Sequence, residues 1–218
     1  MTLKLNGSSS GSVSIDAPAS TTGGADVTFA LPVADGSSGQ ALTTNASGQL
    51  AFATAGLFSS YAIICDQKDS TTDGGTFTTG AWRTRDLNTE ISDPDSIVSI
   101  SSNQFTLQAG NYLIKWRAPA YDCTRHVTRL YDVTNSALRQ YGAAAYTNSS
   151  DQVVTTSDGF ARVTPTGATA YEIQHSCQES RADYGLGVAS EINASGDHDS
   201  GTTEGYSIYT VVEIYKEA

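Results

Sequence analysis

The chain has 218 residues, a formal net charge of −11 and 39% hydrophobic residues, while only 16% of its residues are charged. This length fits one domain of ordinary size plus a smaller piece. The acidic balance excludes nucleic-acid binding from the functions that we expect, because a surface that binds phosphates is basic. No apolar run approaches the roughly 20 residues of a membrane-spanning helix, so we expect no membrane insertion.

Residues 1–56 form a segment with few charged or aromatic side chains. Its apolar residues alternate in short pieces, at Val13 and Ile15, at Val27, Phe29 and Leu31, and at Leu50 and Phe52. This spacing predicts short strands separated by glycine-containing turns. Each strand has too few apolar residues to build a core in one chain, so we expect an oligomeric segment in which three chains share a thin core. A disordered Ser/Gly/Thr linker is the alternative.

Residues 31–50 read LPVADGSSGQALTTNASGQL. This string resembles the "LP-x-x-DG-x-x-GQ-x-L-x-T-x-x-x-G-x-L" segments of phage fibre and virion-associated proteins. The resemblance implies that residues 1–56 attach the protein to other virion proteins or form a trimeric neck. It also implies localisation on the virion surface, which agrees with the absence of an apolar leader in the polar first residues of the chain.

Residues 57–218 form the second predicted domain, which reads as consecutive strands. The segments with strand-like composition and alternation are 61–65, 82–87, 97–100, 103–107, 112–116, 127–133, 137–146, 152–156, 160–164, 171–177, 185–189 and 207–215. Turn-forming residues separate them at spacings that suit a β-sandwich or a barrel. We therefore predict an all-β fold for the whole chain.

Residues 103–121 carry the clearest strand pattern of the chain. Phe105 and Leu107 alternate, Gly110 follows in a tight turn, and Tyr112 begins a second alternating set that continues to Trp116. Period-two spacing puts each set on one face of a sheet, and we interpret the pair as a hairpin. The Phe-x-Leu-x-x-Gly-x-Tyr pattern resembles the globular head of the complement and tumour-necrosis-factor superfamily, as do residues 130–135 and the last strand. This resemblance implies a ten-stranded jelly-roll sandwich that assembles as a homotrimer. No collagen-like Gly-x-y repeat precedes it, which argues against a complement function.

The last predicted strand, 207–215, is apolar on both faces. One face carries Ile208, Val212 and Ile214, and the opposite face carries Tyr209, Val211 and Tyr215. A strand with one solvated face is polar at alternate positions. We therefore predict that Tyr209, Val211 and Tyr215 lie in the trimer interface; the alternative is that a loop of the same chain covers them.

The sequence contains no convincing catalytic or metal-binding motif. His126 and His175 fall within predicted strands, and we interpret them as packed or partly exposed strand residues. The runs 93–95 and 197–199 hold paired aspartates that would suit a metal, but turns and solvated acidic loops explain them more simply. No Ser/His/Asp arrangement, nucleophile elbow or β-helix repeat is present, so we predict neither an enzyme nor a cofactor.

The three cysteines are widely spaced and show no metal-binding pattern. This spacing predicts buried small side chains, with one disulfide left open.

The predicted function is host-surface adsorption by a phage fibre or appendage. The long polar loops would carry the contact, with Tyr146, His198 and Tyr206 as candidate receptor-binding residues. The expected partners are copies of the same chain, other virion proteins, and a host glycan or outer-membrane protein. A capsid-decorating structural fibre without a specific receptor is the alternative.

Overall fold

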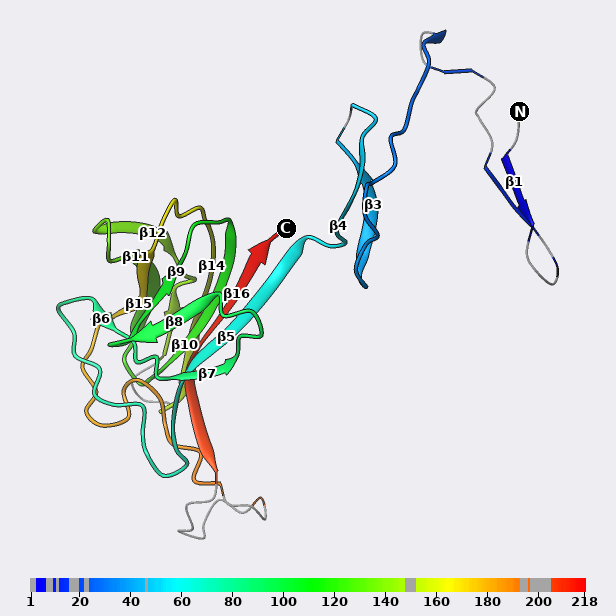
Figure 1. Ribbon diagram of the computed structural model, residues 1–218. Helices are drawn as coiled ribbons and strands as arrows, with labels where there is room; N and C mark the ends of the chain where they lie inside the picture. Colours follow the sequence, from blue (N-terminus) through cyan, green and yellow to red (C-terminus); the bar gives the residue numbers. More distant parts are fainter. Residues whose placement is uncertain are drawn as a thin grey trace. The chain divides into compact units, whose positions relative to one another are not determined.

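The computed structural model describes residues 3–6, 10, 12–15, 20–21, 24–45, 47–147, 152–192, 196 and 205–218. Contacts divide the chain into two units, Met1–Ala55 and Gly56–Ala218, here named the N-terminal unit and the head. Residue 56, which the sequence analysis assigns to the first segment, thus falls in the head. The named elements of the described residues are all strands, and none of these residues forms a helix long and apolar enough to cross a membrane (Figure 1).

The N-terminal unit consists of two antiparallel strand pairs. β1 (Leu3–Asn6) pairs with β2 (Ser12–Ile15), and β3 (Gln40–Thr44) pairs with β4 (Leu50–Thr54). The strands predicted around residues 13–15 and 50–52 are therefore present. The strand predicted at 27–31 is absent, and only a bridge between Ala30 and Gln49 forms there. The exposed large apolar side chains among the described residues of this unit are Val27, Phe29, Leu31, Val33, Leu42 and Phe52.

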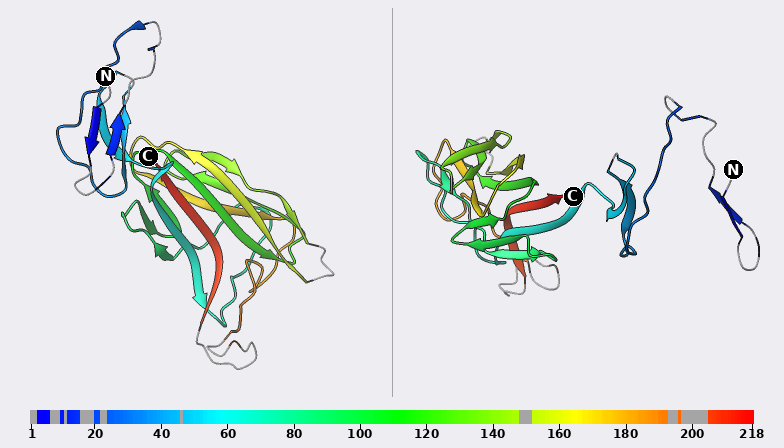
Figure 2. Two further views of the ribbon diagram at one scale, coloured as in Figure 1. Left: turned by 90° about the vertical axis from the view of Figure 1, so that its right-hand side faces the viewer. Right: turned by 45° about the horizontal axis from the view of Figure 1, so that its top comes forward.

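The head is a sandwich of two antiparallel sheets (Figure 2). The five-stranded sheet has the order β14 (Val154–Val163), β10 (Tyr112–Tyr121), β16 (Tyr206–Glu217), β5 (Phe58–Asp69) and β7 (Thr89–Ser92). The seven-stranded sheet runs β12 (Ala137–Tyr141), β11 (Arg125–Asp132), β15 (Thr169–Cys177), β9 (Gln104–Leu107) and β8 (Val98–Ser101), with β6 (Arg83–Thr84) beside β15 and β13 (Ala145–Tyr146) beside β11.

The connections of the head follow a jelly-roll path. The chain passes to the opposite sheet between β9 and β10, between β10 and β11, between β14 and β15, and between β15 and β16. Most neighbours within a sheet are therefore distant in sequence, as in a double-sheet jelly roll. The predicted all-β, jelly-roll fold is confirmed.

Residues 103–121 form two strands, but the predicted hairpin between them is wrong. β9 pairs with β8 and β15, whereas β10 pairs with β14 and β16 in the other sheet. The chain crosses between the sheets at Gly110, whose backbone N–H donates to the carbonyl of Pro165 at 3.0 Å. Alternation identifies the strands and their inward faces, but it does not identify their partners.

The core lies between the two sheets and contains the residues that the alternation predicts. Phe105, Leu107, Tyr112, Ile114 and Trp116 are all buried in one cluster. The indole N–H of Trp116 donates to Thr128 Oγ1 at 2.8 Å, which satisfies its polar atom inside the core.

Two further strand predictions need correction. The segments predicted at 152–156 and 160–164 belong to the single strand β14, and no strand forms at 185–189. Residues 157–159, which connect the two predicted segments, are polar or glycine, but they pair with residues 116–118 of β10 and so continue the strand.

Candidate functional site

The outer face of the five-stranded sheet carries the main apolar surface of the head. Leu113, Tyr215 and Tyr61 are cross-strand partners on β10, β16 and β5, so their side chains share this face. Phe160 on β14 is 70% exposed and Tyr61 is 43% exposed. Val211 lies on the same face and is half-buried. These residues, Tyr61, Leu113, Phe160, Val211 and Tyr215, define what we call the outer apolar face.

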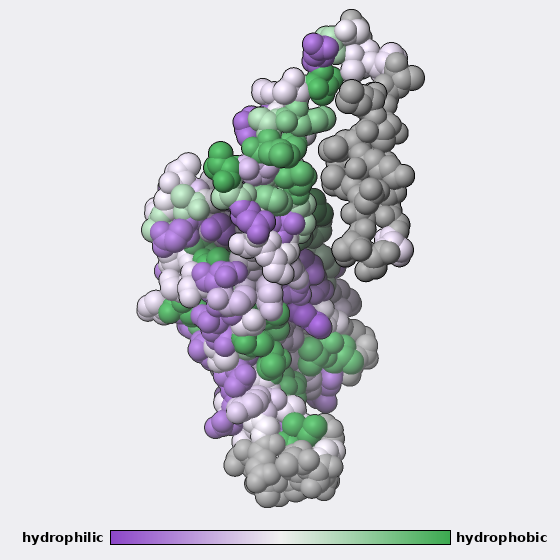
Figure 3. All heavy atoms as spheres, turned by 45° about the vertical axis from the view of Figure 1, so that its right-hand side comes forward, coloured by the Kyte–Doolittle hydropathy of each residue, from purple (hydrophilic) through white to green (hydrophobic). Residues whose placement is uncertain are grey.

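A groove of about 480 Å³ runs along β10 on this face. Its walls include Leu113, Phe160 and Val211, together with the charged pair Lys115 and Glu213. Figure 3 shows hydrophobic residues reaching the surface of the head as patches between polar ones. Soluble monomers rarely expose a contiguous apolar patch larger than a few hundred Å². This face therefore has the character of a contact surface.

Two ion pairs cross the outer face of the five-stranded sheet, Lys115–Glu213 and Arg162–Glu217, the second with Arg162 Nη2 2.6 Å from Glu217 Oε2. Lys115 Nζ lies 3.0 Å from Glu213 Oε2, and the hydroxyl of Tyr215 donates to the same oxygen at 2.5 Å. The hydrogen bond from Tyr215 and then the ammonium group of Lys115 lower the pKa of Glu213. Glu213 is thus kept charged and paired, so burial of this face would leave no unpaired charge at this position.

Of the three predicted interface residues, Val211 and Tyr215 lie on the outer apolar face, but Tyr209 does not. A β-bulge between Ile208 and Val211 inserts one extra residue into β16 relative to β5. The bulge exchanges the two faces on its N-terminal side, so Ile208, predicted to be core, is exposed, and Tyr209 is buried. The assignment of Tyr209 to a subunit interface is therefore corrected.

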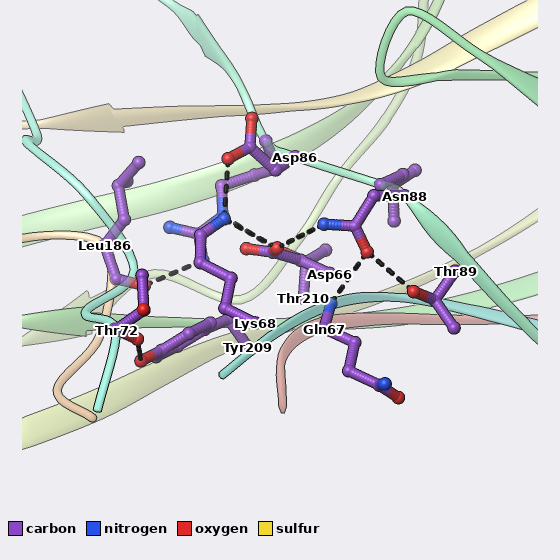
Figure 4. A network of polar contacts seen from close by, with 12 residues as sticks. Asp66, Gln67, Lys68, Thr72, Asp86, Asn88, Thr89, Leu186, Tyr209 and Thr210 are labelled. Atoms are coloured by element: carbon purple, nitrogen blue, oxygen red, sulfur yellow. Dashed lines mark hydrogen bonds and ion pairs between the residues drawn. The ribbon is translucent and has the colours of Figure 1, made fainter. Parts of the chain in front are cut away.

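Tyr209 is held by loops of its own chain. Its hydroxyl donates to the carbonyl of Thr72 at 2.6 Å, and its ring lies against Gly187. Figure 4 shows this contact at one side of a polar network around β5 and β16. This is the alternative that the sequence left open, in which a loop of the same chain covers the strand.

The polar network fixes the loops at one end of the sandwich. Lys68 Nζ lies 2.7 Å from Asp66 and 2.8 Å from Asp86, and Asn88 donates to Asp66 at 3.1 Å. The neighbouring Arg85 is buried and donates to Thr210, at 2.7 Å, and to two backbone carbonyls. Burial lowers the pKa of Arg85 to about 10. The arginine is a structural cation that the sequence does not mark, because it follows β6 in an irregular segment and nothing local distinguishes it from the exposed Arg83.

Two of the three predicted receptor-binding residues lie at this same end, which we call the loop end. Tyr146 is 56% exposed on β13, and the Arg125 guanidinium lies 5.5 Å from its ring centroid. Tyr206 is 64% exposed at the start of β16. A third exposed tyrosine, Tyr184, packs edge-on against Tyr121 at the end of β10. The predicted residue His198 and the run 197–199 lie outside the described residues.

The other end of the sandwich holds the entry of the head and the C-terminus. Ala218 N–H donates to the carbonyl of Leu57 at 3.2 Å. Because β10 runs antiparallel to β16, Tyr121 and the start of β16 lie at the end opposite to Ala218. The loop end is therefore the end farthest from the point where the chain enters the head.

The remaining candidates for chemistry have structural roles. His126 Nδ1 and His175 Nε2 are 2.9 Å apart in the interior, so these histidines are packed strand residues, as predicted. Asp93 accepts backbone N–H groups of Ile97 and Val98, both at 2.9 Å, which makes it a turn residue. All three cysteines are buried and unbridged. Within the described residues no group of three or more His, Cys, Asp or Glu side chains could hold a metal ion.

Sequence reasoning missed one further cluster of aromatic and cationic side chains. Arg129 of β11 lies between the rings of Trp82 and Tyr131 on the outer face of the seven-stranded sheet. Arg129 and Tyr131 alternate in sequence, which is a signal for a shared face. The contribution of Trp82 comes from a distant segment and leaves no local signal.

Comparison with known proteins gives structural likeness alone. No family model and no curated protein matches the chain. Similar solved structures include the globular domain of zebrafish complement 1qA protein (13% identity, TM-score 0.44, 72% of this chain and 95% of that one). Murine APRIL is also similar (6% identity, TM-score 0.43, 72% of this chain and 98% of that one). So is Eiger TNF from S. frugiperda (9% identity, TM-score 0.46, 72% of this chain and 92% of that one). These identities are too low to carry a function from those proteins to this chain.

Proposed function

We propose that this chain is a homotrimeric, non-enzymatic binding module, whose heads associate through the outer apolar face and present their loop ends to a partner. The observation that carries the proposal is the aromatic and aliphatic surface formed by Tyr61, Leu113, Phe160, Val211 and Tyr215. Burying such a surface gives roughly 25 cal/mol per Å² of apolar area. A contact between copies of the chain would remove this surface from water.

The stoichiometry of three follows from the resemblance of residues 105–112 to the complement and tumour-necrosis-factor head. Three copies around an axis need a heterologous contact, in which two different patches of each subunit meet and the ring closes. The outer apolar face is long enough to serve as one of these patches, since it crosses four neighbouring strands from β14 to β5.

The N-terminal unit supports the same assembly. Val27, Phe29, Leu31 and Val33 are exposed in the single chain, and a strand pair with so little buried apolar surface is marginal in water. Three copies would cover these side chains in a shared neck. This assembly would also serve the attachment to other virion proteins that residues 31–50 suggest.

The biological setting that we propose is a phage fibre or appendage on the virion surface. Its loop ends would contact a glycan or an outer-membrane protein of the host. Exposed tyrosines at the loop end, Tyr146 and Tyr206, support this part of the proposal, because tyrosine is enriched in protein contact surfaces. Three weak sites on each trimer would combine into stable adsorption. A capsid-decorating fibre without a receptor is the second candidate.

The oligomeric state of the full-length chain tests the assembly. Light scattering during size-exclusion chromatography should give three times the chain mass of 22.8 kDa. The double variant Phe160→Asp/Val211→Asp should dissociate at a higher protein concentration than the wild type, because it buries two charges in the contact between heads while the shared neck is unchanged. The matched control Ser99→Asp, at an exposed position of β8 in the other sheet, should remain trimeric. A monomeric wild type, or a double variant that dissociates at the same concentration as the wild type, would refute the interface.

Adsorption is tested separately. Purified wild-type trimer should compete with phage particles for host cells, and a Tyr146→Ala/Tyr206→Ala variant that is still trimeric should compete less well. A trimer that fails to compete at saturating concentration would favour the decorating fibre. Imaging of the particle then distinguishes density on the tail from density on the capsid.

A further inference from the structure

We propose that the outer face of the seven-stranded sheet holds a binding site for a carboxylate-bearing sugar, centred on Arg129. Arg129 and Tyr131 point outward from β11, and Tyr141 of β12 and Gln174 of β15 are the cross-strand partners of Arg129. Trp82, from the segment before β6, lies over the same position. Five side chains from four different segments thus meet on the side of the sandwich opposite to the outer apolar face.

The guanidinium group of Arg129 is oriented but not neutralised. Its central carbon lies 4.1 Å from the centroid of the Trp82 ring and 4.9 Å from that of Tyr131, so the planar group is stacked against aromatic rings. Its Nε donates to Gln174 Oε1 at 2.7 Å. Within the described part of the chain, no recorded hydrogen bond or ion pair engages its two terminal nitrogens.

A second contact keeps Gln174 in place. Its amide nitrogen donates to Glu172, a buried carboxylate of the same strand. The amide oxygen therefore points towards Arg129, which sets the rotation of the guanidinium plane. Such a fixed fork loses little side-chain entropy when it binds a planar anion through two parallel hydrogen bonds.

The chemistry around Arg129 favours a sugar acid over other anions. Tyr141 is exposed and its ring lies 6.0 Å from that of Trp82, which offers an aromatic surface beside the guanidinium. Aromatic side chains combine an apolar body with a polar tip, which suits the mixed surface of a pyranose ring. The net charge of −11 repels densely charged polymers, so a ligand with a single carboxylate per contact is favoured.

Two matched sugars test the site on the full-length chain. Methyl β-D-glucuronide and methyl β-D-glucoside share the pyranose ring and differ only in the carboxylate. Calorimetric titration should show at least about tenfold tighter binding of the glucuronide, since a hydrogen bond to a charged group contributes about 1.5–3 kcal/mol. The chain has two tryptophans and Trp116 is buried, so a change in emission that vanishes in Trp82→Phe would locate the ligand.

Variants of two arginines on the same strand separate this site from the loop end. Arg129→Gln should remove the preference for glucuronide, and Arg129→Lys should weaken it about tenfold, because lysine lacks the planar fork. Arg125 lies on the same face of β11 as Arg129 but contacts Tyr146 at the loop end. The control variant Arg125→Gln should therefore bind the glucuronide as tightly as the wild type does.

Three results would overturn the assignment. The first is no binding of the glucuronide up to its solubility limit, and the second is equal binding of both sugars. The third is a loss of binding in Arg125→Gln but not in Arg129→Gln, which would assign the sugar to the loop end. If the acidic dipeptide N-acetyl-Glu-Glu-amide bound more tightly than the glucuronide and depended on Arg129, the site would be one for acidic peptides instead.

Discussion

Acidification from neutral pH should destabilise the head through its two interior histidines. His126 Nδ1 lies 2.9 Å from His175 Nε2, and His126 Nε2 lies 2.7 Å from Thr155 Oγ1. Both rings are buried, and the Phe77 ring centroid is 4.7 Å from that of His175. The nearest charge that acts on both is the buried Arg85 guanidinium. A proton on either ring would add a second buried cation.

Burial, and then the charge of Arg85, lower the pKa of His126 from 6.5 to about 4. The same causes, followed by His126 itself, lower the pKa of His175 well below its usual value. The unfolded chain therefore binds protons that the folded chain refuses once the pH falls below 6.5. The contribution of His126 to the free energy of unfolding is constant above pH 6.5 and falls between pH 6.5 and about pH 4. Below about pH 4 it is constant again, because His126 is then protonated in both states.

At about pH 5 the pH lies roughly 1.5 units below the pKa of a histidine in the unfolded chain. Each of these units lowers the free energy of unfolding by about 1.4 kcal/mol, because the unfolded chain binds the proton and the folded chain does not. His126 alone should thus remove about 2 kcal/mol from the free energy of unfolding, and His175 adds to this loss. The carboxylates with lowered pKa, Asp132, Glu213 and Glu217, act below their ordinary pKa values of 3.8 for aspartate and 4.5 for glutamate. Burial raises the pKa of Asp66, so this carboxyl acts in the opposite direction on acidification, and the difference between the wild type and His126→Gln/His175→Gln reports the histidines.

Urea unfolding of the full-length chain, followed by circular dichroism at about pH 7.5 and about pH 5, measures this loss. Protein concentration must be equal at both pH values, because association contributes to stability. His126→Gln/His175→Gln should flatten the pH dependence whatever its own stability, and His198→Gln should retain it. A wild-type difference below about 0.5 kcal/mol, or an unchanged slope in the double variant, would refute the reasoning.

Two substitutions of glycine and one of tyrosine test the packing of the sandwich. Gly159→Ala would put a Cβ 2.1 Å from the Trp116 ring and should lower the free energy of unfolding by about 1–3 kcal/mol, measured by thermal unfolding. The control Gly167→Ala places its Cβ more than 4 Å from any other atom, so its stability should equal that of the wild type. Tyr209→Phe removes the hydrogen bond to the Thr72 carbonyl and should cost about 1 kcal/mol of stability.

The interior of the head follows closely from local sequence patterns. Phe105, Leu107, Tyr112, Ile114 and Trp116 alternate in sequence and are all buried. The reason is that successive side chains of a strand point to opposite faces, which is a property of the local backbone. The composition and the turn signals likewise determined the all-β class.

The candidate surfaces were only partly predictable. Val211 and Tyr215 were found because their strand is apolar on both faces, and the structure keeps them outside. Leu113 and Phe160 were missed, because only the sheet order places β10, which carries Leu113, beside β16, and places β14, which carries Phe160, beside β10. The stacking of Trp82 on Arg129 has the same origin, since 46 positions of chain separate them.

By itself, the sequence determined that this protein is built from strands and which side chains of most strands face inward. Only the tertiary structure decided that β9 and β10 belong to different sheets. It also decided that a bulge before Val211 buries Tyr209 in the head and exposes Ile208 at its surface. The alternation of side chains between the two faces of a strand is fixed by the backbone of a few residues. The pairing and register of strands depend on partner strands that lie far away in the sequence. One inserted residue reverses the face of every position on one side of it.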